Sequence, residues 1–177
     1  MEEELAKMGL RGERFAAIEN TNGAIGCSMS HLAILKDAKA KGYKNILVLE
    51  DDFQFIVDRT TFEKELQSFF DLNIPYDVLM LSYRCIEKKP YDTIVSRAID
   101  VLTASGYIVH ERFYDTLLRI WEEGLQKFIE TGYLGYTLDA YWKSLQPSSQ
   151  WFLMNTRIGV QRESYSDNEK RLVNYKM

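Results

Sequence analysis

Cysteine, histidine and proline are scarce in this sequence of 177 residues. The chain has two cysteines, Cys27 and Cys85, and two histidines, His31 and His110. The cysteines show no CxxC spacing, so neither a disulfide framework nor a zinc cluster is expected. Isolated cysteines are typical of a reducing compartment, which predicts a cytoplasmic location. A chain of this length buries about 70% of its unfolded surface, so its core needs neither crosslinks nor a structural metal.

Net positive charge and long apolar runs are also missing. The 22 lysines and arginines are outnumbered by 26 aspartates and glutamates, which gives a net charge of −4. This balance lacks the basic field by which nucleic-acid-binding proteins attract phosphates, so we expect no nucleic-acid partner. No apolar run reaches the roughly 18 residues that a membrane-spanning helix requires. The opening MEEELAK lacks the basic and apolar regions of a secretory signal.

The remaining sequence predicts a single α/β domain over residues 1–177, because only three prolines and no repeat interrupt it. Two apolar runs, 45–49 and 77–81, are typical of strands buried on both faces of a parallel sheet. A capping box of Thr60 and Glu63 begins a helix between them. This βαβ unit predicts a mixed, mainly parallel sheet flanked by helices. Other expected elements are helices at 2–8, after the turn at 22–26 up to a Gly42 cap, at 111–130 and from Thr137, strands at 15–18, 105–109 and 151–154, and a hairpin of 93–95 with 98–102.

The acidic triplet Glu50-Asp51-Asp52 directly follows the first of these strands. Side chains two apart on an extended chain share a side, so Glu50 and Asp52 are expected to point together and Asp51 away. Open α/β sheets bind ligands at the carboxyl edge of their strands. Two carboxylates there suit Mg²⁺ or Mn²⁺, which would stabilise a nucleotide diphosphate leaving group. The alternative interpretation is that the triplet is a solvated loop.

Two blocks of the sequence together resemble one enzyme family. The residues 26–31, Gly-Cys-Ser-Met-Ser-His, open a helix, and the strand 45–49 leads into Glu-Asp-Asp-Phe. This order resembles glycosyltransferase family 25, which includes lipooligosaccharide and collagen galactosyltransferases. Shorter matches follow at 76–81, 103–109, 138–141 and 161–167, so the resemblance spans about residues 14 to 168.

The resemblance implies a GT-A-like (Rossmann-like) fold and a hexosyltransferase. The donor would be a UDP-sugar carrying galactose or glucose, with Mn²⁺ or Mg²⁺ as cofactor. The acceptor would be a glycan or glycoprotein, as in lipopolysaccharide biosynthesis, and transfer would invert the anomeric carbon. An acceptor hydroxyl is a poor nucleophile, so a carboxylate must take its proton while the metal holds the diphosphate.

The resemblance also assigns roles to single residues. Asp139 is the candidate base; its alternative role is to stabilise the dipole of the helix in whose first turn it falls. For His31, the alternative to ligand contact is a buried histidine bonded to the neighbouring strand. The candidate metal ligands are Asp52, Glu50 and Asp167. The candidate donor-binding residues are Glu50, Asp51, Ser30, His31, Gln161 and Ser166.

The usual first strand of that family, Ile-Asn-Leu followed by basic residues, is not found here. Residues 1–9 correspond at best to the helix after it. We therefore expect an exposed sheet edge where the uridine would bind, and through which copies of the chain could associate into a homo-oligomer. Two other functions remain open. One is a non-catalytic remnant of the fold that acts as a binding or assembly module, and the other is a Mg²⁺-dependent phosphohydrolase.

Overall fold

The computed structural model describes residues 1–166 and 171–173. Its helices are α1 (Glu2–Lys7), α2 (Gly23–Ala40), α3 (Arg59–Asp71), α4 (Tyr114–Thr131) and α5 (Leu138–Tyr141), with 3₁₀ helices at Glu111–Phe113, Leu134–Tyr136 and Trp142–Ser148. Its strands are β1 (Asn45–Leu49), β2 (Phe53–Phe55), β3 (Val78–Met80), β4 (Arg84–Pro90), β5 (Val95–Leu102), β6 (Gly106–His110), β7 (Trp151–Met154), β8 (Gly159–Gln161), β9 (Ser164–Ser166) and β10 (Arg171–Val173). None of the described helices is long and apolar enough to cross a membrane.

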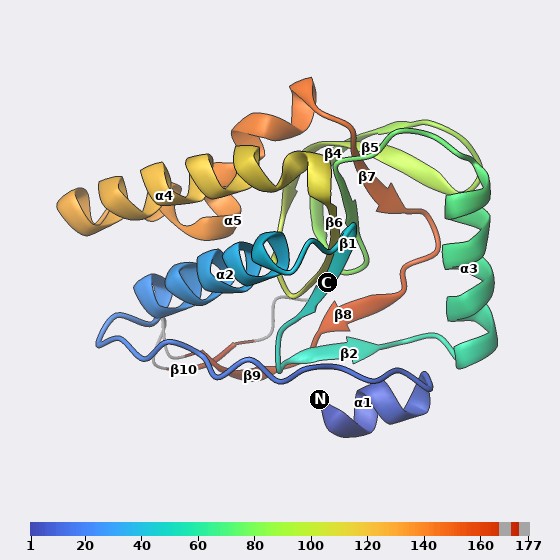
Figure 1. The fold of residues 1–177 in the computed structure, drawn as a ribbon, viewed down its shortest axis with the longest axis horizontal. Coiled ribbons are helices and arrows are strands. Elements are labelled where there is room, and N and C mark those ends of the chain that lie inside the picture. Colours follow the sequence, from blue (N-terminus) through green and yellow to red (C-terminus); the bar gives the residue numbers. More distant parts are fainter. Residues whose placement is uncertain (167–170, 174–177) are drawn as a thin grey trace.

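The centre of the molecule is a six-stranded sheet with the order β1-β6-β3-β7-β5-β4 (Figure 1). Strands β3 and β7 pair in parallel, and the other neighbours pair antiparallel. Strands β1 and β3 share one direction, as in the predicted βαβ unit, but β6 lies between them and runs the opposite way. The predicted GT-A-like α/β class, a mixed sheet flanked by helices, is confirmed. The sheet has more antiparallel pairs than we predicted. Strands β1, β3 and β7 share one direction, but β6 lies between β1 and β3, and β5 lies beside β7, and both run the opposite way.

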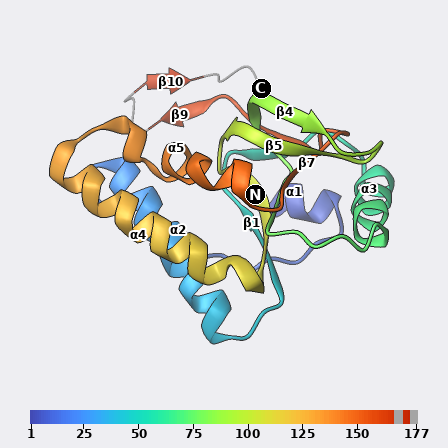
Figure 2. The ribbon, with the colours of Figure 1, turned by 90° about the horizontal axis from the view of Figure 1, so that it is seen from above.

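Helices cover both faces of this sheet. Helices α2 and α4 lie side by side on one face, and α3 lies on the other (Figures 1 and 2). Alternation along β3 lets one strand serve both layers. Val78 and Met80 join the core that contains residues of α2 and α4, whereas Leu79 joins the core that contains Phe62 and Phe69 of α3. The sheet is therefore packed on both sides.

Local sequence sets the ends of α2. The Asn22 side chain caps the first turn by accepting a backbone N–H at 3.1 Å, and Gly42 beyond the last turn has a φ of +69°. The predicted helix and its Gly42 cap are confirmed. At α3, the predicted capping box of Thr60 and Glu63 is wrong. Asp58 caps that helix instead, because its carboxylate accepts a backbone N–H of the first turn at 2.8 Å.

Residues 15–18, predicted as a strand, belong to no strand. The backbone N–H of Ile18 donates to Ser30 Oγ at 2.8 Å. A Cβ on Gly26 would lie 2.7 Å from the Ile18 carbonyl oxygen, so this close approach requires a glycine. The segment therefore packs along α2 instead of joining the sheet.

Strand β1 also differs from its prediction. It lies at one edge of the sheet, pairs antiparallel with β6, and has Val48 as its one buried residue. An apolar run indicates burial by side chains above and below, but it does not distinguish a central strand from an edge strand. The predicted hairpin likewise forms with a different partner, since β5 pairs with β4, and residues 93–95 form no strand of their own because Val95 already begins β5.

Candidate active site

The acidic triplet forms a turn immediately after β1. The backbone N–H of Glu50 donates to the Ser105 carbonyl at 2.8 Å, and that of Phe53 donates back to the Glu50 carbonyl at 3.1 Å. Because the chain turns, the alternation expected for an extended triplet does not apply. Glu50 contacts α2, Asp52 contacts β8, and Asp51 is exposed.

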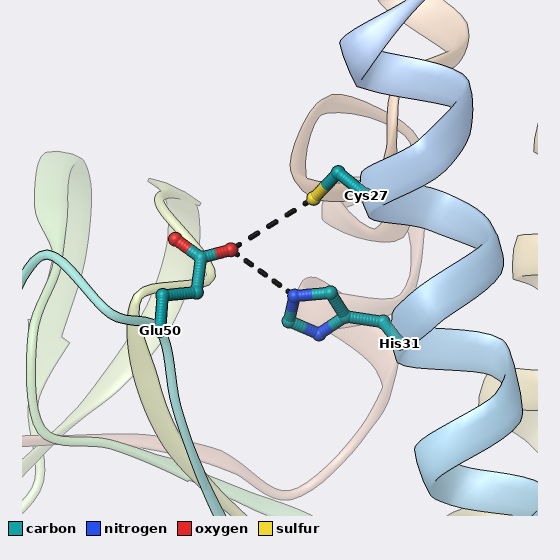
Figure 3. A group of neighbouring side chains, drawn as sticks. All are labelled: Cys27, His31 and Glu50. Atoms are coloured by element: carbon teal, nitrogen blue, oxygen red, sulfur yellow. Dashed lines mark hydrogen bonds and ion pairs between the residues drawn. The ribbon is translucent and has the colours of Figure 1, made fainter. Parts of the chain in front are cut away.

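Glu50 meets two side chains of α2 (Figure 3). Its Oε1 accepts from His31 Nε2 at 3.0 Å and from the Cys27 thiol at 3.8 Å. Cys27 and His31 are four residues apart, so both lie on the same face of the helix. The Glu50 side chain keeps 24% of its surface exposed, whereas His31 is buried. The second carboxylate oxygen of Glu50 turns away from this pair (Figure 3).

The hydrogen-bond partners of His31 define its tautomer. A carboxylate accepts hydrogen bonds only, so Nε2 carries the proton that is donated to Glu50. Nδ1 then accepts from the Tyr107 hydroxyl at 2.6 Å. Burial, together with Glu50, raises the pKa of Tyr107 well above its ordinary value, so the phenol keeps its proton. Trp121 packs edge-on against the imidazole with ring centroids 6.0 Å apart, which closes this end of the group with apolar surface.

Asp52 is held by β8. Its Oδ2 accepts from Gln161 Nε2 at 2.8 Å. The two-stranded sheet of β2 and β8 sets this contact by pairing Phe53 with Gln161. Phe53 is fully buried, and a Cβ on either Gly106 or Gly159 would come within 2.5 Å of its ring. The absence of a side chain at these two glycines leaves space for the Phe53 ring. With Phe53 in place, its pairing with Gln161 positions the Gln161 side chain beside Asp52.

Asp139 reaches the same region from the first turn of α5. Its Oδ2 accepts the backbone N–H of Thr103 at 3.0 Å. Burial, with Glu50 as the nearby charge, raises the pKa of Asp139. Thr103 has a φ of +88°, a strained conformation for a β-branched residue. The bond from Asp139 helps to hold that backbone.

Three carboxylates influence the Cys27 thiol electrostatically. Burial raises the pKa of Cys27 well above its ordinary value, and Glu50, Asp139 and Asp52 raise it further. We call these three carboxylates, with Cys27 and His31, the acidic site. Carboxylate oxygens are the donors that a hard divalent cation prefers, so Glu50 and Asp52 suit in kind the Mg²⁺ or Mn²⁺ that the family resemblance implies.

The other predicted residues are placed differently. Both partners of the Ser30 hydroxyl are backbone groups, since it donates to the Gly26 carbonyl at 2.8 Å and accepts from Ile18. Ser30 thus fixes the segment before α2. Ser166 lies in β9, but its side chain lies outside what the structure describes, and so does Asp167. The Arg162 guanidinium donates to the backbone carbonyl of Asp51 at 3.0 Å, so it stabilises the turn that contains the acidic triplet.

A pocket of about 230 Å³ lies at the opposite end of the sheet, where β3 begins and β6 ends. Tyr76 and His110 meet edge-on in its wall with centroids 5.4 Å apart. Its cation, Arg112, donates to Asp77 at 2.9 Å. We call it the aromatic pocket, lined by Phe69, Phe70, Asn73, Ile74, Pro75, Tyr76, His110 and Arg112.

Sequence reasoning missed three residues in and around the acidic site. As one of two isolated cysteines, Cys27 carries no predicted role, although its spacing of four from His31 is a usable signal. Tyr107 is predicted only as part of a strand, because its partner is 76 residues away. The strain at Thr103 has no local sequence signal, since glycine is the residue that usually marks a positive φ.

Comparisons with known proteins agree on one family. A family model for glycosyltransferase family 25, described as an LPS biosynthesis protein, matches residues 13–137. The chain is 26% identical over 88 residues to probable inactive glycosyltransferase 25 family member 3 of Rattus norvegicus, and 26% identical over 91 residues to the protein of that name in Bos taurus. Each match covers 49% of this chain, but only 15% and 14% of the two relatives.

A solved structure is also similar, at lower sequence identity. The crystal structure of mannose-1-phosphate geranyltransferase from Thermus thermophilus aligns with 90% of this chain and 55% of its own, at a TM-score of 0.46 and 11% identity. The family match is the stronger finding, since it contains Cys27, His31, Glu50 and Asp52. Because it covers well over half of the sequence, the chain belongs to glycosyltransferase family 25.

Proposed function

We propose that this chain transfers a hexose from a UDP-sugar to a hydroxyl of a glycan or a protein-linked sugar, with a divalent metal and with inversion at the anomeric carbon. The observation that carries the proposal is the placement of Glu50 and Asp52 on one turn after β1, with the buried Asp139 near enough for Glu50 to raise its pKa. These carboxylates come from two separate segments of the chain. A purely structural fold has no need to gather like charges, whereas diphosphate chemistry needs a cation that such charges hold.

Asp52 and Glu50 are the proposed metal ligands. Bound there, Mn²⁺ or Mg²⁺ would stabilise the negative charge that accumulates on the departing diphosphate. Gln161 orients Asp52, and His31 orients Glu50, through the contacts of 2.8 and 3.0 Å. Asp167 remains a proposed third ligand, outside the described residues.

Asp139 is the proposed base that takes the proton of the acceptor hydroxyl. Its pKa is raised by burial and by Glu50, which makes its carboxylate a better proton acceptor than an ordinary aspartate. The bond from Thr103 occupies Oδ2 and fixes the orientation of the group. A metal near Glu50 would relieve the repulsion between the two carboxylates.

The direct test measures ligand binding and turnover on the chain as it is. We expect UDP with Mn²⁺ to raise the melting temperature, and UDP-galactose or UDP-glucose to be consumed, with UDP release followed by chromatography. Asp139→Asn keeps an oxygen for the Thr103 N–H, so it should retain the melting shift and lose turnover. An absence of both binding and turnover in folded protein excludes the proposal.

A second candidate is a non-catalytic binding domain. It is favoured by the names of the two relatives, each described as probably inactive. This candidate predicts a melting shift with UDP and Mn²⁺ but no consumption of either UDP-hexose. The acceptor, a lipopolysaccharide-type glycan in view of the family description, and the cytoplasmic location are further parts of the proposal.

A further inference from the structure

The acidic site contains a second set of donors, which shares Glu50 with the proposed Mg²⁺ or Mn²⁺ ligands and adds Cys27 and His31. Cys27 Sγ, His31 Nε2 and Glu50 Oε1 all lie within 4.8 Å of one another (Figure 3). They combine a sulfur, an imidazole nitrogen and a carboxylate oxygen. This mixture is typical of thiophilic transition metals such as Zn²⁺, whereas Mg²⁺ and Mn²⁺ prefer oxygen alone.

The spacing of the donors is within a few tenths of an ångström of tetrahedral coordination at the two measured pairs. Bonds of about 2.0 to 2.3 Å to a tetrahedral zinc ion place a nitrogen, an oxygen and a sulfur roughly 3.3 to 3.6 Å apart. The observed distances from Glu50 Oε1 are 3.0 Å to the nitrogen and 3.8 Å to the sulfur. Small side-chain shifts would therefore admit an ion, without movement of α2 or β1.

The surroundings also suit a bound metal. Cys27 and His31 stand four residues apart on a rigid helix, a spacing that presents two ligands to one ion. Tyr107 bonds the other imidazole nitrogen at 2.6 Å, the position from which an outer partner orients a metal-bound histidine. The partly exposed Glu50 provides the route from solvent.

We propose that Cys27, His31 and Glu50 form a three-ligand site for a thiophilic divalent cation of the Zn²⁺ class, with the fourth position taken by water. Cys27 coordinates as the thiolate and releases its proton to solvent. His31 coordinates through Nε2, and its ring proton moves to Nδ1, which then donates to the Tyr107 oxygen. One proton is released for each ion bound.

Because Glu50 belongs to both donor sets, Zn²⁺ should compete with Mn²⁺-dependent UDP binding. This consequence rests on the proposed function, but the cation site itself does not. If the site binds Zn²⁺ while UDP and Mn²⁺ have no effect, only the proposed function fails.

The test uses Co²⁺ as a spectroscopic substitute for Zn²⁺, in the absence of nucleotide. The chain has two cysteines, so in Cys85→Ser the one remaining thiol is Cys27. We expect one equivalent of Co²⁺ to give this variant a thiolate-to-metal charge-transfer band and intense tetrahedral d–d bands. Zn²⁺ should abolish these bands, and an equal concentration of Mg²⁺ should leave them unchanged, because Mg²⁺ has little affinity for a thiolate.

The matched variant is Cys27→Ser, which keeps a hydroxyl for Glu50 but removes the sulfur. We expect it to lose the charge-transfer band, and Tyr107→Phe to weaken Co²⁺ binding about tenfold. A band that persists in Cys27→Ser, or no band in Cys85→Ser, overturns the proposal. If Cys27→Ser fails to fold, the spectrum of Cys85→Ser decides alone.

Discussion

The two ends of the central sheet contain the same kinds of side chain in opposite electrostatic arrangements. At the aromatic pocket, Asp77 accepts from the Arg112 guanidinium at 2.9 Å and from the Gln150 backbone at 2.7 Å. At the acidic site, Glu50 accepts from an imidazole and a thiol, and its charge raises the pKa of the buried Asp139. The first end pairs a carboxylate with a guanidinium, whereas at the second a carboxylate repels another.

This difference separates structural charge from functional charge. A carboxylate paired with arginine and backbone holds two strands in place and has little left to offer a ligand. Carboxylates that repel one another, as Glu50 and Asp139 do, cost folding energy, and a bound cation would offset that cost. The comparison therefore predicts that mutations at the acidic site alter function, whereas mutations at the pocket alter stability.

The largest effect is expected for Asp52→Asn. Removing one charged ligand should lower sugar transfer by about 100-fold, equivalent to about 2.7 kcal/mol of transition-state stabilisation. Urea unfolding should change little, because the asparagine keeps an oxygen for Gln161. Asp115→Asn, a change on a side chain that is 77% exposed on α4, is the matched control and should transfer sugar at the wild-type rate. Equal activity in the two variants would contradict the assignment.

Asp77→Asn should do the reverse. Both carboxylate oxygens of Asp77 accept hydrogen bonds, but asparagine has one oxygen and one NH₂ group. The NH₂ group would face either Arg112 or the Gln150 N–H, so one hydrogen bond would be replaced by repulsion between two donors. We expect the free energy of unfolding to fall by about 2 kcal/mol. Chemical denaturation measures this loss, and turnover per folded molecule should remain at the wild-type level. A stable but inactive Asp77→Asn would reverse the comparison.

The two histidines are an exception to this comparison, because His31 at the acidic site is buried and His110 at the pocket is only partly buried. His31→Gln disturbs bonds to Tyr107 and Glu50 in a buried position, so we expect a loss of about 1.5 kcal/mol. His110 caps a short 3₁₀ helix by accepting from Arg112, and His110→Gln should cost about 0.5 kcal/mol. Thermal melts of both variants rank the two losses of stability. A larger loss for His110→Gln than for His31→Gln would contradict this prediction.

The smallest effect is a pH dependence at Asp139. Because burial and Glu50 raise its pKa above 3.8, the folded protein holds the proton more tightly than the unfolded chain does. Stability from this group is therefore lost as the pH rises from 3.8 through the folded pKa. Asp139→Asn lacks this loss, so its unfolding free energy relative to wild type should increase with pH across that window. Urea titrations with EDTA measure the difference, and a flat or falling trend would show that the charge carries no cost.

Local sequence was sufficient for the elements that position the acidic site. The apolar run before Glu50, the Asn22 turn and Gly42 all act on neighbouring residues, so strand β1 and helix α2 could be predicted. The partner of β1 could not, because its pairing with β6 joins residues far apart in the chain and leaves no local pattern. The contact of Asp52 with Gln161 spans 109 positions and depends on the seating of Phe53.

The roles of Ser30 and Asp139 show a different limit. Both residues lie in segments that resemble family motifs, which predicted donor binding for Ser30 and proton abstraction for Asp139. The structure gives Ser30 two backbone partners and gives Asp139 a strained backbone to hold. A motif indicates that a residue type is required at a position. Only the surrounding contacts show whether the residue serves the reaction or holds the fold.

The place of β7 in the sheet has a consequence for how the protein is made. This strand lies between β3 and β5, although it follows both of them at a long distance in the chain. During synthesis, the hairpin of β4 and β5 emerges early and forms from local contacts, but it has no strand to join it to β3. The halves of the sheet meet only after residue 154 has left the ribosome, and Gln161 reaches Asp52 later still. A nascent chain halted before that point would expose both sheet edges while lacking the ligand-binding arrangement altogether.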